Sequence, residues 1–244
     1  MRTLLLIICF LWPLGSMAQE AEALQYRHCL TQAKLKPDDG LEEALAWASM
    51  GGGEPARHCM ALARIGQKQY DDGAKRLEAL AVESHQNKFI RADMLSQAAQ
   101  AWMLADNWDK ADADQRSALS LVPDNPDILV DHAITLGQVH HYQEAADELT
   151  HVLKTQPGRI DALVLRASAH RYLDDRKGAL DDVERALMLD PTDPDGLLER
   201  GILRRLDNDK NGARADWVKI ITATSTGATA DAARRNLELL DVEH

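Results

Sequence analysis

Apolar residues recur at the three- and four-residue spacing of amphipathic helices along nearly the whole chain, and no segment alternates with the two-residue period of a half-buried strand. Helix starts are well marked: Asn125 precedes Pro126, and Asp193 precedes Pro194, and a capping side chain followed by proline is typical of a helix N-terminus. The pattern therefore predicts an all-α protein. The expected helices lie near 20–35, 40–50, 55–66, 70–82, 92–105, 108–121, 126–139, 142–155, 160–173, 176–189, 194–207, 210–222 and 230–240.

The hydrophobic pattern repeats with a fixed period. Pro123, Pro157 and Pro191 stand 34 residues apart, and each closes a unit at its position 32. The units are 92–125, 126–159, 160–193 and 194–227. Small residues occupy position 8 and position 20 of every unit: Ala99, Ala133, Ala167 and Gly201, then Ala111, Ala145, Ala179 and Ala213. Such a period predicts a solenoid, in which each unit buries its apolar face against its neighbours.

These positions resemble the tetratricopeptide repeat (TPR) family, which has small residues at 8 and 20, a bulky residue near 11, an aromatic near 17 and a closing proline. Trp102 and Trp108 fill positions 11 and 17 of the first unit, and Tyr142 fills position 17 of the second. Ser225 replaces the proline of the fourth unit, and polar Gln115 fills the usually bulky position 24 of the first. The resemblance implies a right-handed superhelical solenoid of antiparallel helix pairs with a C-terminal capping helix, and a protein-binding rather than an enzymatic role.

The sequence divides into four parts. We expect a cleaved signal peptide over 1–18, degenerate helical repeats over 19–91, the four TPR-like units over 92–227, and a capping helix with a tail over 228–244. No long linker separates these parts, so one continuous domain is expected after the signal.

The N-terminus has the layout of an export signal. Arg2 precedes an apolar run of 11 residues at 4–14, and Ser16 and Ala18 stand at the small-residue positions of a cleavage site. The run is shorter than the roughly 20 residues of a spanning helix, which favours cleavage after Ala18 over an uncleaved tether. A periplasmic location is expected, with secretion as the alternative.

Charge limits the possible partners. The net charge is −11, and it becomes −12 without the signal, where Arg2 is the one charged residue. An acidic chain without a basic stripe is a poor match for phosphate backbones or anionic lipid surfaces. No phosphate-binding, nucleophile or metalloprotease motif occurs, so we expect no enzyme activity, cofactor or metal.

Two cysteines remain after the signal, Cys29 and Cys59, in matching Arg-His-Cys tripeptides. In an oxidising compartment such a pair favours a disulfide, and two buried free thiols are the alternative. A zinc site that adds His28 and His58 is disfavoured, because adjacent helical residues diverge by roughly 100°.

Other charged residues have structural interpretations. Arg166 and Arg200 at position 7 are expected to pair with Asp182 and Asp216 at position 23 of the same units. Five further histidines are interpreted as scattered surface residues: His132, His140, His141, His151 and His170.

The TPR resemblance also implies a concave partner-binding groove, lined by positions 2, 5, 9, 12 and 13 of the first helix of each unit. Carried over, these positions include Met103, Leu104, Val130, Ile134, Gln138, Val164, Ser168, Arg171, Tyr172, Leu198, Ile202 and Arg205. Such a groove suits a peptide or helix of another protein. The two arginines predict that this segment carries an acid; the alternative is that both arginines neutralise neighbouring carboxylates such as Glu199. We expect an exported scaffold or adaptor, in cell-envelope assembly, with a permanent structural subunit of a larger envelope complex as the alternative.

Overall fold

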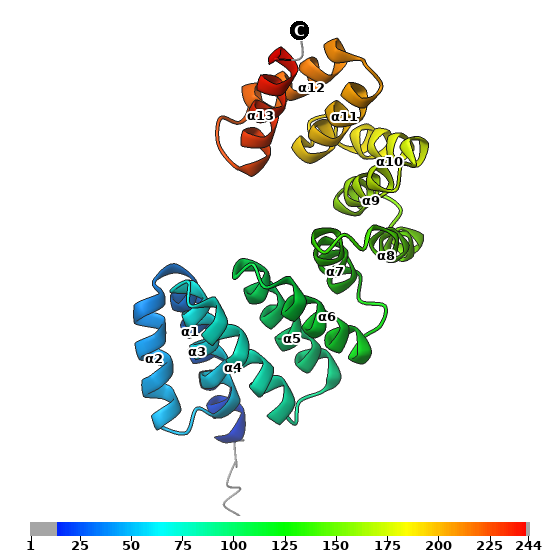
Figure 1. Ribbon diagram of the computed structural model, residues 1–244. Helices are drawn as coiled ribbons and strands as arrows, with labels where there is room; N and C mark the ends of the chain where they lie inside the picture. The colour runs from blue at the N-terminus through cyan, green and yellow to red at the C-terminus, as the bar shows by residue number, and fades with distance from the viewer. Residues whose placement is uncertain (1–13, 243–244) are drawn as a thin grey trace, which may run out of the picture. The chain divides into compact units, whose positions relative to one another are not determined.

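The computed structural model describes residues 14–242, and within that range the chain forms helices and no strand (Figure 1). The chain divides at Gln86–Asn87 into two compact units, where the sequence led us to expect one continuous domain. No helix within 14–242 combines the length and apolar character needed to cross a membrane.

The first unit contains four helices. They are α1 (Leu14–Leu35), α2 (Pro37–Ser49), α3 (Gly53–Gly66) and α4 (Tyr70–Glu83). Its core gathers small residues from the first three helices: Cys29, Ala33, Ala44, Cys59 and Ala63. Helix α1 continues through the expected cleavage site after Ala18, and residues 1–13 of the expected signal lie outside the described range.

The second unit contains helix pairs in succession, from α5 in green to α13 in red in Figure 1. The first helices of the pairs are α5 (Lys88–Leu104), α7 (Pro126–Gln138), α9 (Ile160–Tyr172) and α11 (Pro194–Leu206). Their partners are α6 (Trp108–Leu121), α8 (Tyr142–Thr155), α10 (Arg176–Leu189) and α12 (Lys210–Ala223), and α13 (Ala228–Val242) follows.

Capping side chains explain where several of these helices begin. The Asn125 side chain accepts hydrogen bonds from the backbone N–H groups of Asp127 and Ile128, and Asp193 accepts one from Gly196 N–H, as the sequence predicts. Asn87 does the same for Phe89 and Ile90. This cap starts α5 four residues before the expected position 92.

Each turn within the pairs of the second unit contains one residue in the left-handed region: Asp106, His140, Asp174 and Asn208, with φ of 58°, 65°, 61° and 64°. The next residue donates its N–H to the carbonyl five residues earlier; for example, His141 N–H donates to Leu136 C=O at 2.8 Å. This bond satisfies a carbonyl that the helix end would leave free.

The small residues of the repeat allow the helices to pack closely. Ala111, Ala145, Ala179 and Ala213 are all buried. At Gly201 an added Cβ would collide with the Trp217 indole, which explains why glycine replaces alanine there. Helix α13 places Ala230, Ala233 and Leu240 on the core around Trp217 and Ile220, so it covers the last pair as the sequence predicts.

Candidate functional site

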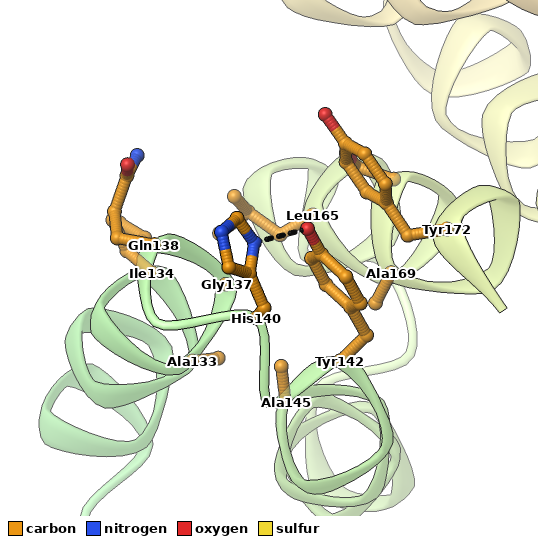
Figure 2. Close-up of a pocket in the computed structure, with 11 residues that line it drawn as sticks. Ala133, Ile134, Gly137, Gln138, His140, Tyr142, Ala145, Leu165, Ala169 and Tyr172 are labelled. Carbon is orange, nitrogen blue, oxygen red and sulfur yellow. Dashed lines mark hydrogen bonds between the residues drawn. The ribbon is translucent and has the colours of Figure 1, made fainter.

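The first helices of the second and third pairs enclose a pocket of about 260 Å³ (Figure 2). The floor is made of small and aliphatic residues, and the rim is polar and aromatic. The lining residues are Ala133, Ile134, Gly137 and Gln138 of α7, His140 of the turn, Tyr142 and Ala145 of α8, and Leu165, Ser168, Ala169 and Tyr172 of α9. An apolar floor under hydrogen-bonding groups is the usual chemistry of a recognition pocket.

Aromatic side chains build the rim of the α7–α9 pocket. The left-handed backbone of His140 sets its ring at the mouth, where Nδ1 lies 2.6 Å from the Tyr142 hydroxyl (Figure 2). The Tyr142 and Tyr172 rings stack with centroids 4.4 Å apart and planes 5° from parallel. Tyr172 is nevertheless 56% exposed, so the pair presents an edge and a hydroxyl to solvent.

Arg171 supports this rim from behind. Its guanidinium carbon lies 4.3 Å from the centroid of the Tyr172 ring. Its Nε donates to Glu199 of α11 at 2.5 Å, and its Nη2 donates to Ser168 at 3.1 Å. Burial alone would lower the pKa of Arg171, but the Glu199 carboxylate raises it overall. Arg171 therefore neutralises Glu199, which removes half of the basis for expecting an acidic partner.

The structure places the predicted groove residues in several environments. Ile134, Gln138, Ser168 and Tyr172 line the α7–α9 pocket together. The others do not join it: Met103, Leu104, Val130, Val164, Arg171, Leu198, Ile202 and Arg205.

Two of the predicted groove residues lie in the core instead. Val130 and Val164 are only 4% and 8% exposed and belong to the core around Leu149. Position 5 of these helices is turned toward the helix packing, so both side chains offer little surface to a partner.

The pocket also contains residues that the sequence analysis missed. His140 was interpreted as a scattered surface residue and Tyr142 only as part of the repeat pattern, yet both line the pocket. Gly137 stands in the last turn of α7, and a Cβ added there would meet no heavy atom within 4 Å. A glycine at position 12 of its unit, one residue before Gln138, was the available signal for an opening on this face.

The predicted ion pairs are confirmed, and a third follows the same rule. Arg166 donates twice to Asp182 at 2.7 Å, and Arg200 donates to Asp216 at 2.9 and 2.7 Å. The corresponding residues of the second repeat are His132 and Glu148, where Nδ1 lies 2.9 Å from Oε1. We call His132, Arg166 and Arg200 the position-7 cations.

His132 is therefore not the surface residue expected from the sequence. Its side chain is 1% exposed, and its Nε2 lies 2.8 Å from Asp112 Oδ1 of α6. Because carboxylates only accept hydrogen bonds, both ring nitrogens must carry protons, which defines an imidazolium. Burial lowers the pKa of His132, but the bonds to Glu148 and Asp112 outweigh burial and raise it overall.

In the first unit, Cys29 and Cys59 are both fully buried, with Cα atoms 6.1 Å apart. That separation lies within the range of a disulfide. Their neighbours His28 and His58 take different partners: His28 Nε2 lies 3.5 Å from Glu43, and His58 Nδ1 lies 2.6 Å from the Tyr26 hydroxyl.

Comparison with solved structures agrees with this geometry. The chain is similar to a tetratricopeptide repeat protein from Parabacteroides merdae (16% identity, TM-score 0.64), with 93% of this chain and 88% of that one covered. It is also similar to YrrB, described as a TPR protein with an unusual peptide-binding site (14% identity, TM-score 0.59, 75% and 94% covered). MamA from Desulfovibrio magneticus RS-1 is similar as well (15% identity, TM-score 0.62, 72% and 97% covered).

These similarities show that the chain has the all-α repeat fold of the TPR proteins. The sequence itself matches no protein-family model and no curated protein.

Proposed function

We propose that this protein is a non-enzymatic scaffold that holds a segment of another protein against the first helices of its repeats. The observation that carries the proposal is the α7–α9 pocket. Its volume of about 260 Å³ is slightly below the roughly 300–1,000 Å³ that small-molecule sites occupy. It suits one or two apolar side chains, and the Gln138 amide and the Nε2 atom of His140 lie at the rim, where they can bond the backbone of the segment that carries them.

Site-specific photo-crosslinking tests this function. We place benzoylphenylalanine at Gln138, on the exposed rim of the pocket, or at Met188, which is 74% exposed on α10. A partner held at the pocket should crosslink from Gln138 and not from Met188. Crosslinking from Met188 alone would contradict the proposal.

A variant that fills the pocket, paired with a matched control, tests whether the crosslink depends on the pocket. Gly137→Leu should extend a side chain into the pocket, because a Cβ at this position meets no heavy atom within 4 Å, and it should also favour the helix. Gly158→Leu adds the same side chain at a site where the nearest heavy atom, Leu189 Cδ1, is 3.9 Å away. We expect Gly137→Leu to abolish the Gln138 crosslink and Gly158→Leu to preserve it.

The cellular setting is part of the proposal. An N-terminal signal and a buried cysteine pair with disulfide-compatible spacing support export to an oxidising compartment such as the periplasm, and a role in cell-envelope assembly follows. We retain the assignment of four repeats over 92–227, preceded by degenerate repeats from 19 to 91. The alternative, a permanent structural subunit, would show stoichiometric copurification and crosslinks from both faces.

A further inference from the structure

A second pocket, of about 220 Å³, lies on the other side of α7, between α5 and α7. It uses positions 2, 5 and 9 of the first repeat, which the predicted groove left out. Its chemistry differs from that of the α7–α9 pocket, because three carboxylates and an aromatic ring stand around it. The lining residues are Phe89, Ala92, Asp93, Ser96, Gln100, Val122, Asn125, Asp127, Ile128 and Asp131.

Asp93 and Asp131 accept hydrogen bonds from neutral side chains, so these bonds leave their negative charges in place. Asp93 accepts a hydrogen bond from the Gln97 amide at 2.8 Å, and Asp131 accepts one from the Gln100 amide at 2.8 Å. Both donors are neutral, so they orient the carboxylates without cancelling their charge. Asp127 differs, because Arg159 Nη1 donates to it at 2.7 Å.

Ser96 points independently to a ligand. It is only 9% exposed and lines the α5–α7 pocket, yet within residues 14–242 its hydroxyl makes no hydrogen bond. Hydroxyls of residues buried to this extent usually have a hydrogen-bond partner. A polar group entering the pocket would satisfy it.

The ligand that fits these groups is a bulky cation. Within the described part of the chain, no three acidic, histidine or cysteine side chains are placed to hold a metal ion. A guanidinium or ammonium on a long stem can reach separated carboxylates and lay its methylenes on Phe89, which is 64% exposed. The Lys88 ammonium already lies 5.3 Å from the centroid of that ring, so a cation is accommodated at this edge.

We propose that the α5–α7 pocket is a subsite for an arginine or lysine side chain of the partner segment. This inference rests on the proposed function and reverses the acidic preference expected from the sequence. Asp131, Ile134 and Gln138 are spaced by three and four residues, so they share one side of α7. A segment crossing that side can place a basic residue by Asp131 and an apolar residue beyond Ile134.

Backbone-amide NMR with two isosteric probes tests the subsite. N-acetyl-L-arginine amide and N-acetyl-L-citrulline amide have the same shape and differ in charge. At millimolar concentration the arginine probe should shift the amide signals of Phe89, Ser96 and Asp131, and added salt should weaken the effect. The citrulline probe should bind at least about tenfold more weakly, which corresponds to about 1.4 kcal/mol.

Variants localise the effect. Asp93→Asn with Asp131→Asn keeps the shape of the pocket, and we expect it to remove the arginine-dependent shifts. Asp147→Asn is the matched control, because Asp147 also accepts a hydrogen bond from a glutamine amide, that of Gln143 at 3.0 Å, but on the exposed face of α8. It should leave the shifts unchanged.

The outcomes separate this inference from the proposed function. Equal shifts with citrulline, shifts that persist in the double variant, or no shifts at these amides would overturn the cation subsite, whatever the crosslinking shows. Loss of the Gln138 crosslink on pocket filling would still support the scaffold. Arginine binding without any Gln138 crosslink would contradict the function at the α7–α9 pocket and leave the cation subsite standing.

Discussion

Replacing His132 with leucine tests the row of position-7 cations. The change would remove two charge-assisted hydrogen bonds, of 2.9 Å to Glu148 and 2.8 Å to Asp112. Bonds of this kind contribute about 1.5–3 kcal/mol each. The carboxylate side chains are 23% and 27% exposed, so water partly replaces the lost partner. We therefore expect a loss of about 2–4 kcal/mol in the free energy of unfolding.

The size of this loss should depend on pH. The folded-state pKa of His132 is raised above the ordinary 6.5, so its stabilisation is fully present below about 6.5 and disappears as pH rises through the folded-state pKa. Asp112 stays ionised throughout, because hydrogen bonds from Arg116 and His132 lower its pKa despite the opposing effect of burial. Arg116, which also contacts Glu144, stays charged across this range.

The assay is urea unfolding followed by circular dichroism at several values of pH, on the protein, His132→Leu and two controls. His151→Leu removes an exposed histidine whose partner Asp124 is 83% exposed, so its effect should be small. His132→Arg supplies the cation that the next two repeats use and should remove the pH dependence. A His132→Leu penalty that stays constant from acidic to alkaline pH would refute an imidazolium at this position.

Four further predictions concern packing and maturation. Changing both Cys29 and Cys59 to alanine should lower the free energy of unfolding of oxidised protein by about 3–4 kcal/mol in the chain-entropy model for a 30-residue separation; two freely alkylated thiols in exported protein would contradict the bond. Ala145→Leu should cost about 1–3 kcal/mol by overpacking, and an unchanged melting temperature would contradict the assigned repeat register. Gln115 is fully buried, and its Oε1 has no hydrogen-bond partner. Gln115→Leu should therefore raise the free energy of unfolding by about 1 kcal/mol, which is measured as a higher melting temperature. Intact mass of protein from its native host should show cleavage after Ala18; a retained leader would disprove it.

Most of the fold could be predicted from the sequence, because the signals that set it are local. The cap at Asn125 followed by Pro126 starts α7, and α6 to α12 begin where expected, while α13 begins two residues before the expected position 230. The start of α5 was missed because the 34-residue count outweighed the cap at Asn87. The division at Gln86–Asn87 depends on long-range packing, which no local signal reports.

The site was only partly predictable. Family positions identified Ile134 and Tyr172, which do line the α7–α9 pocket, but they could not distinguish a groove residue from core at Val130. For Arg171 the alternative holds: it bonds Glu199 of the next repeat, 28 residues away, and only the packing of α9 against α11 decides between the two interpretations. The sequence gives no sign of the pocket beside Asp93, because this pocket forms only when α5 and α7 pack together.

The left-handed turn residues give the four repeats the same backbone conformation at the turn that borders the α7–α9 pocket. Asp106, His140, Asp174 and Asn208 share nearly one backbone conformation, yet only His140 lines the α7–α9 pocket. Side chains at these positions can therefore diverge without any change in the path of the chain. Specificity could drift from one repeat to another by single substitutions, and a protein engineer could transplant the His140 and Tyr142 pair into the turn that holds Asp174 without redesigning a helix.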